Sequence, residues 1–289
     1  MIPIHVGQCG NRMGKALVEE LCTDHGIGKE IFSVQNDMLD GRELFFDLSD
    51  SGRYIYRGIM ADLEPRVLSM IQASEYGGVY NPENVYLASD GGGSGNTYSG
   101  GYNKCSEAMK SLMDIVQREA EASDKIESFM LTHSVSGGTG SGMGSRLLES
   151  LRDAYPKKMV QTYSVFPVKD ESNNVLQTYN AMLAVSQHTL YADMVTVVDN
   201  KALSQMGTTF EDMNKVVSEI MNMATAPIRN GSTSCDTFME QVVELCPFQP
   251  VHFIGTGKWW DGEYGRVKQG KAKWGYTGEQ DKAEYSGLE

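Results

Sequence analysis

The chain has 289 residues, 40% of them hydrophobic, which is enough for one large α/β domain and part of a second. Its formal net charge of −13 disfavours a nucleic-acid partner, because a phosphate backbone would be repelled. The sequence has no apolar stretch long enough to span a bilayer and no signal-peptide pattern, so no membrane partner is expected. The five cysteines lack zinc-ligand spacing, which is typical of a reduced, cytosolic protein.

Short apolar runs alternate with amphipathic stretches along most of the chain. The expected strands are Ile2–Val6, Ile59–Ala61, Val85–Ala88, Phe129–His133, Val160–Phe166, Met194–Val198 and Val251–Ile254. The expected helices are Gly10–Cys22, Tyr102–Ala122, Gly142–Ala154, Val175–Ser186 and Phe210–Thr225. This alternation predicts an α/β fold with a mostly parallel sheet flanked by helices on both faces. Pro227 is expected to end the last helix early, since an internal proline costs about 3 kcal/mol.

Three glycine-rich turns each follow a predicted strand: Gly7–Asn11, Asp90–Asn96 and Ser134–Gly144. Glycines let the main chain approach an anion, and a helix start offers unpaired N–H groups and a positive dipole. A single such run is often only a connector, but three at the carboxyl ends of parallel strands favour a phosphate-binding site. The P-loop pattern and the G-x-G-x-x-G dinucleotide pattern are both absent, which disfavours a dehydrogenase.

The run Gly137–Gly144, Gly-Gly-Thr-Gly-Ser-Gly-Met-Gly, resembles the signature of the tubulin superfamily. Gly7–Asn11, Asp62–Pro65 and Gly93–Asn96 are similar to that family's other nucleotide loops. Three further stretches resemble its gamma branch: Leu63–Val67, Tyr80–Asn84 and Pro156–Pro167. The resemblance covers roughly residues 2–257 and implies a tubulin/FtsZ-like GTPase domain.

This resemblance implies a site for GTP or GDP with Mg²⁺. The positions matching the family's phosphate-binding residues are Gly93, Gly95, Asn96, Gly137, Gly138, Thr139 and Gly140, and Ser134 is placed in the same nucleotide site. Those matching contacts with the base or sugar are Gln8, Cys9, Gln177, Asn200, Phe210 and Asn214. Asp62 and Glu64 match acidic positions near the Mg²⁺ ion, which is expected to be bound through water.

Plain structural roles compete with some of these assignments. Phe210 alone reads as a core residue, and Asn200 alone as the cap of a turn. Asp62 suits an acidic helix start, because Pro65 fits a first turn.

The chain also departs from the family near the sugar and the base. Asn173 stands where the family usually has Asp, and Thr178 where it has Pro. Only the residues 204–208 separate Leu203 from the helix start at Thr209. A short helix near the base is therefore expected to be missing.

By analogy, residues 1–208 form the GTP-binding domain, 209–230 the central helix, and 231–257 the start of an intermediate domain. The rest of that domain and a C-terminal helical pair are expected to be absent from this chain. Residues 258–289 contain three tryptophans but no sustained periodicity. They are expected to be an atypical, poorly ordered tail, with a small hairpin around the tryptophans as the alternative.

In this family, GTP hydrolysis is completed across a contact between subunits, so the chain is expected to be a weak GTPase at most. Counted back from Pro247, Glu240 falls at the catalytic glutamate of alpha-tubulin; counted forward from Asp236, Met239 does. A lone helical glutamate on a solvated face is the plain alternative.

The function implied is that of a gamma-tubulin-like protein that nucleates microtubules. The implied partners are alpha/beta-tubulin, gamma-tubulin complex proteins and laterally associated copies of the chain. The implied location is the cytoplasm and cytoskeleton, at a microtubule organising centre such as the centrosome or spindle pole. The alternative is a truncated, divergent paralogue that binds partners without nucleating.

Overall fold

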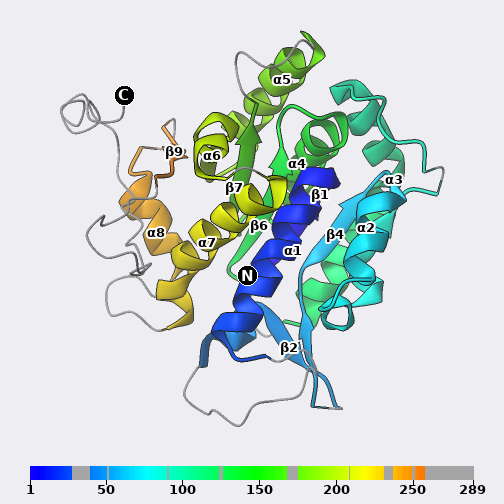
Figure 1. Ribbon diagram of the computed structural model, residues 1–289. Coiled ribbons are helices and arrows are strands. Elements are labelled where there is room, and N and C mark those ends of the chain that lie inside the picture. Colours follow the sequence, from blue (N-terminus) through cyan, green and yellow to red (C-terminus); the bar gives the residue numbers. More distant parts are fainter. Residues whose placement is uncertain are drawn as a thin grey trace.

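The computed structural model describes residues 1–27, 40–50, 52–89, 91–123, 126–167, 175–207, 209–230, 237–248 and 251–257. Within them lies a seven-stranded sheet in the order β5-β4-β1-β6-β7-β8-β9, in which every pairing is parallel. Its strands are β1 (Ile2–Val6), β4 (Ile59–Asp62), β5 (Val85–Leu87), β6 (Ser128–Ser134), β7 (Met159–Phe166), β8 (Met194–Asp199) and β9 (Phe253–Gly255). Figure 1 shows helices on both faces of this sheet. The predicted α/β fold is confirmed.

Helices connect most of the successive strands of the sheet, and α6, α7 and α8 follow one another between β8 and β9. They are α1 (Gly7–Asp24), α2 (Pro65–Gln72), α3 (Tyr98–Glu121), α4 (Gly144–Ala154), α5 (Val175–Tyr191), α6 (Asn200–Met206), α7 (Phe210–Arg229) and α8 (Phe238–Leu245). Shorter turns are η1 (Asp40–Leu44), η2 (Gly77–Val79), η3 (Pro82–Asn84) and a π-helical turn, η4 (Thr139–Met143). Among the described residues, no helix is both long and apolar enough to cross a bilayer.

Two apolar cores lie on opposite faces of the sheet, because side chains alternate along each strand. Ile2, Ile4 and Val6 of β1 pack in the core that includes α3 and α4. Met60 of β4 and Met130 of β6 pack in the other core, with residues of α1, α2, α7 and α8. Figure 1 shows α1 and α7 side by side in front of the sheet, with α4 behind it.

Several elements differ from the sequence prediction. The antiparallel pair β2 (Phe46–Leu48) and β3 (Tyr54–Tyr56) is not predicted, because each strand is too short to show a period. Helix α6 forms directly after β8 and is capped by the Asp199 side chain, which accepts from the Lys201 N–H at 2.8 Å. The expectation of a missing helix near the base is therefore wrong: a short helix is present there.

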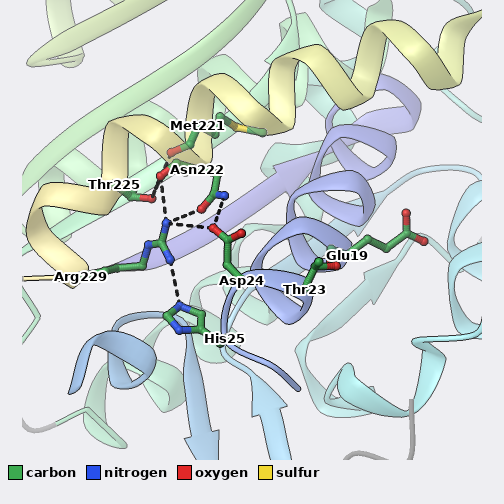
Figure 2. Close-up of polar contacts among 8 residues, drawn as sticks. All are labelled: Glu19, Thr23, Asp24, His25, Met221, Asn222, Thr225 and Arg229. Atoms are coloured by element: carbon green, nitrogen blue, oxygen red, sulfur yellow. Dashed lines mark hydrogen bonds and ion pairs between the residues drawn. The ribbon is translucent and has the colours of Figure 1, made fainter. Parts of the chain in front are cut away.

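The prediction that Pro227 ends α7 early is also wrong, since α7 continues to Arg229. Tertiary contacts of the last turn overcome the helix-breaking effect of the proline. The buried Arg229 guanidinium donates to the backbone carbonyl of Asn222 at 3.0 Å and to its side chain. It also lies 2.9 Å from His25 Nε2 and 3.9 Å from Asp24 Oδ2, beside the end of α1 (Figure 2). These bonds hold the turn that contains the proline.

Some predictions concern residues outside the described ranges or the region after residue 230. The Asn173 position, the residues 231–236 and the proposed tail at 258–289 lie outside the described residues. Residues 253–255, expected at the start of an intermediate domain, pair with β8 as the edge strand β9.

Candidate functional site

A cavity of about 420 Å³ lies at the carboxyl ends of the central strands. It is bordered by the ends of β1, β4, β6 and β7 and by residues of α1, α2, α5, α6 and α7. From β1 the chain builds β4 and β5 on one side of the sheet, then returns to build β6–β9 on the other. Ligands of open α/β sheets bind at such a reversal point.

Most of the residues assigned to a nucleotide site line this one cavity. They are Gln8, Cys9, Asp62, Glu64, Asn96, Ser134, Gly137, Gly138, Thr139, Gly140, Gln177, Asn200, Phe210 and Asn214. Gly93 and Gly95 are not in the lining, but they flank Ser94, which is. The roles of these residues in binding stay predictions; what the structure establishes is their convergence.

The turn before α3 owes its path to left-handed backbone. Gly93, Gly95 and Asn96 have φ of 62°, 61° and 55°, and Asn96 is the one non-glycine with positive φ among the described residues. A buried amide on α5, Asn180, joins this turn to the one after β6. Its nitrogen donates to the carbonyls of Asn96 and Ser136, at 3.0 Å each, and its oxygen accepts from the Tyr98 N–H at 2.8 Å. Sequence reasoning missed Asn180, since a single asparagine carries no local pattern.

The glycines after β6 let three segments of main chain approach one another. A Cβ on Gly138 would lie 2.2 Å from Ser94 Oγ and 2.6 Å from the Thr97 nitrogen. A Cβ on Gly140 would lie 2.6 Å from the Ser134 carbonyl oxygen. A Cβ on Gly137, by contrast, would meet no heavy atom within 4 Å. Gly137 therefore borders open space in the cavity, whereas Gly138 and Gly140 are required for packing.

The same turn supplies donors for an anion. Residues 137–140 line the cavity and lead through η4 into α4. The first turn of a helix leaves its N–H groups without partners in the helix, and the helix dipole makes this end positive. Arg12 and Arg66 line the same cavity and add two cations that the sequence did not indicate. The cavity therefore suits a ligand that carries several negative charges.

Asp62 and Glu64 give the cavity an acidic side. Asp62 is 3% exposed, and burial raises its pKa to about 6, partly offset by hydrogen bonds from the N–H groups of Leu63 and Glu64 and from the Asn11 side chain. In the described part of the chain, no cluster of three or more His, Cys, Asp or Glu is placed to hold a metal ion. A cation here would need ligands from water and from the bound anion, which is the usual arrangement for Mg²⁺ beside phosphates.

The roles open to two other side chains at the cavity, Phe210 and Cys9, depend on how exposed each one is. Phe210 is 69% exposed at the start of α7, so it is not a core residue. Its ring is available to pack on a planar ligand, with Asn214 one turn further along. Burial raises the pKa of the Cys9 thiol to about 11, against an opposing effect of Arg12. Cys9 is thus a neutral thiol rather than a nucleophile.

Glu240 lies outside the cavity lining, on α8. It forms a capping box with Thr237: the Thr237 N–H donates to its carboxylate and its own N–H donates to the Thr237 hydroxyl, both at 3.3 Å. This is a structural role at a helix start. A catalytic role for Glu240 stays a prediction.

A model of the Tubulin/FtsZ family, GTPase domain, matches residues 1–208, the part of the chain that holds almost the whole cavity lining. The chain belongs to this family. The match supports the tubulin superfamily resemblance and identifies the chain as a tubulin-like GTP-binding protein.

The residues of this tubulin-family cavity fit a guanine nucleotide. The Gly137–Gly140 turn and the two arginines suit the phosphates. Gln8, Asn200 and Asn214 offer amides for a polar base edge or a sugar, and the exposed Phe210 ring offers a stacking face. The buried Asp62 carboxylate, with its raised pKa, fits a position next to a cation.

Proposed function

We propose that this chain is a gamma-tubulin-like GTP-binding protein that nucleates microtubules at organising centres. The observation that carries the proposal is that the glycine turn after β6 and the ends of β1 and β4 line one and the same cavity. Membership of the Tubulin/FtsZ family supports GTP or GDP as its ligand. The gamma assignment rests on the stretches Leu63–Val67, Tyr80–Asn84 and Pro156–Pro167.

In this proposal the main chain of residues 137–140 binds the phosphates and small side chains keep the turn open. Gln8, Asn200, Phe210 and Asn214 hold the base and sugar. Asp62 and Glu64 hold Mg²⁺ through water, and the ion, when bound, neutralises phosphate charge. Any hydrolysis is weak and would require a contact between subunits.

The proposed partners are alpha/beta-tubulin, gamma-tubulin complex proteins and neighbouring copies of the chain. The proposed location is the cytoplasm and cytoskeleton, at a centrosome or spindle pole. We propose no nucleic-acid partner, because the net charge of −13 would repel a phosphate backbone.

A second candidate is a divergent paralogue that binds partners without nucleating. It is favoured by the shortness of α6, which spans only Asn200–Met206 beside the base-side residues. It is also favoured by the capping role of Glu240, which engages that carboxylate within its own helix start.

A nucleation assay with purified alpha/beta-tubulin separates the two candidates. We expect wild-type protein loaded with GTP to shorten the lag before microtubules form, and Gly137→Ala to do so less because it crowds the nucleotide site. GTP binding without any effect on the lag would favour the second candidate. Absence of GTP binding in folded protein would contradict the first candidate.

A further inference from the structure

Two buried histidines lie directly beneath the glycine turn that follows β6. His133 is on β6 and His188 is on α5, and both are 0% exposed. His133 Nδ1 lies 2.8 Å from the carbonyl oxygen of Gly140, which lines the cavity. His133 Nε2 lies 2.7 Å from His188 Nε2, with the ring planes 15° apart. A chain of ring nitrogens thus connects the turn to α5.

The hydrogen-bond partners of this pair determine where its protons lie. A carbonyl only accepts, so His133 donates its Nδ1–H to Gly140 and His188 donates its Nδ1–H to the carbonyl of Ala184. A neutral imidazole has one N–H. Two neutral rings would therefore face each other with lone pairs on both Nε2 atoms, only 2.7 Å apart.

One additional proton between the two Nε2 atoms replaces this repulsion with a charge-assisted hydrogen bond. The nearby Ser164 hydroxyl, 3.1 Å from His133 Nε2, can donate to His133. Even with this hydrogen bond from Ser164, the Nε2 lone pair of His188 still faces His133. The geometry of the pair is therefore best satisfied when it carries one positive charge.

Burial opposes that charge. In the absence of an anion, burial lowers the pKa of His133 to about 3 and that of His188 to about 4. Within the described residues, the titratable groups that act on the two rings are His188, which lowers the pKa of His133, and His252, which lowers the pKa of His188. The residues that β7 and α4 place beside His133, Ser164 and Gly144, carry no charge. The missing counter-charge is what an anion at the Gly140 turn would provide.

We propose that His133 and His188 take up one proton when the phosphates of a nucleotide bind in the cavity, which places a positive charge beneath the phosphate-binding turn. This inference rests on the proposed nucleotide-binding function. His133 is a positioning residue for the Gly140 turn, and His188 allows the pair to hold the proton. Because binding takes up a proton, affinity rises as the pH falls, by at most about tenfold per pH unit.

His188→Gln is the decisive variant, because its amide N–H can still donate to His133 Nε2 but cannot carry a charge. It keeps the position of His133 and removes the proton. His5→Gln is the matched control: His5 is also fully buried, on β1, but its ring contacts Thr132 and Tyr56 and not the turn. Thermal melts establish that each variant is folded.

Calorimetry of GDP binding in two buffers of different ionisation enthalpy measures how many protons the complex takes up on binding. Dissociation constants measured at neutral and mildly acidic pH give the dependence of affinity on pH. The terminal phosphate titrates in the same range, so the difference from His188→Gln isolates the histidine pair. We expect wild type and His5→Gln to take up as much as one more proton than His188→Gln and to show the steeper slope. Equal uptake and equal slopes in all three proteins would overturn the proposal.

Nitrogen-15 NMR of the histidine side chains gives an answer that needs no variant. We expect the two Nε2 signals to show the uptake of one proton when GDP is added to wild-type protein: either one of them moves to the imidazolium range, or both move about half of the way when the proton is shared in fast exchange. Binding without this movement would overturn the histidine proposal alone. If GDP binds to neither wild type nor His5→Gln at any pH, the proposed function fails and this inference fails with it.

Discussion

Gly137 and Gly138 are neighbours in the turn after β6, yet the structure predicts opposite results for adding one methyl group to each. At Gly138 the new Cβ would lie 2.2 Å from Ser94 Oγ, 2.6 Å from the Thr97 nitrogen and 2.8 Å from the Asn96 carbonyl carbon. Two of these atoms are main chain and cannot move alone. Overpacking of this kind costs about 1–3 kcal/mol. At Gly137 the Cβ would meet nothing within 4 Å.

Gly138→Ala should therefore lower the free energy of unfolding by about 1–3 kcal/mol in urea melts, and should weaken GTP binding because the turns move apart. Gly137→Ala should change the stability of the nucleotide-free protein by less than about 0.5 kcal/mol. Its methyl group enters the space assigned to the phosphates, so GTP affinity should still fall. Calorimetry and melts on both variants check this. Stability loss in Gly137→Ala, or none in Gly138→Ala, would refute the packing of this turn.

Three further predictions concern buried polar groups. Burial raises the pKa of Asp62 from 3.8 to about 6, so ionisation of this carboxyl lowers the stability of the folded protein as the pH rises through that range. Asp62→Asn should therefore stabilise the metal-free protein by as much as about 3 kcal/mol at pH 7.5, and by less at pH 4.5. An equal gain at both pH values would contradict this. Burial lowers the pKa of His5 from 6.5 to about 3, so the free energy of unfolding should fall by about 1.4 kcal/mol for each pH unit below 6.5. In His5→Gln, the loss of stability with falling pH, followed by circular dichroism, should be less steep. An unchanged dependence on pH would contradict this role of His5. Arg229→Met should lower the free energy of unfolding in urea melts by about 2 kcal/mol, because the buried hydrogen bonds of Arg229 are lost while the Asp24 side chain, 44% exposed, stays hydrated. No loss of stability would show that the hydrogen bonds of Arg229 are dispensable.

The sheet could be predicted because each strand is a short apolar run followed by a turn. The glycine runs after β1 and β6 and before α3 could also be recognised in the sequence, because only glycine allows such close approach of main chain to main chain, and these runs border or flank the cavity. The pattern could not show how the turns are joined. Asn180, which bonds both Asn96 and Ser136, is a lone residue of a helix distant in sequence.

The errors have the same origin. The predicted end of α7 comes too early because local propensity gives Pro227 a helix-breaking effect, whereas the contacts of Arg229 with His25 and Asp24 at the end of α1 come from tertiary structure. Arg12 and Arg66 were not recognised as cavity residues for a related reason: Arg12 lies just after the Gly7–Asn11 turn, and nothing in the stretch Leu63–Val67 shows that Arg66 lines the cavity.

The nucleotide content of the purified protein shows whether the turns at neighbouring strand ends form one guanine-nucleotide site. Folded protein is denatured and the released compounds are separated by chromatography and counted. We expect close to one GDP or GTP per chain, and exchange for added GTP in preference to ATP. Folded protein that releases no guanine nucleotide and binds no added GTP would contradict it.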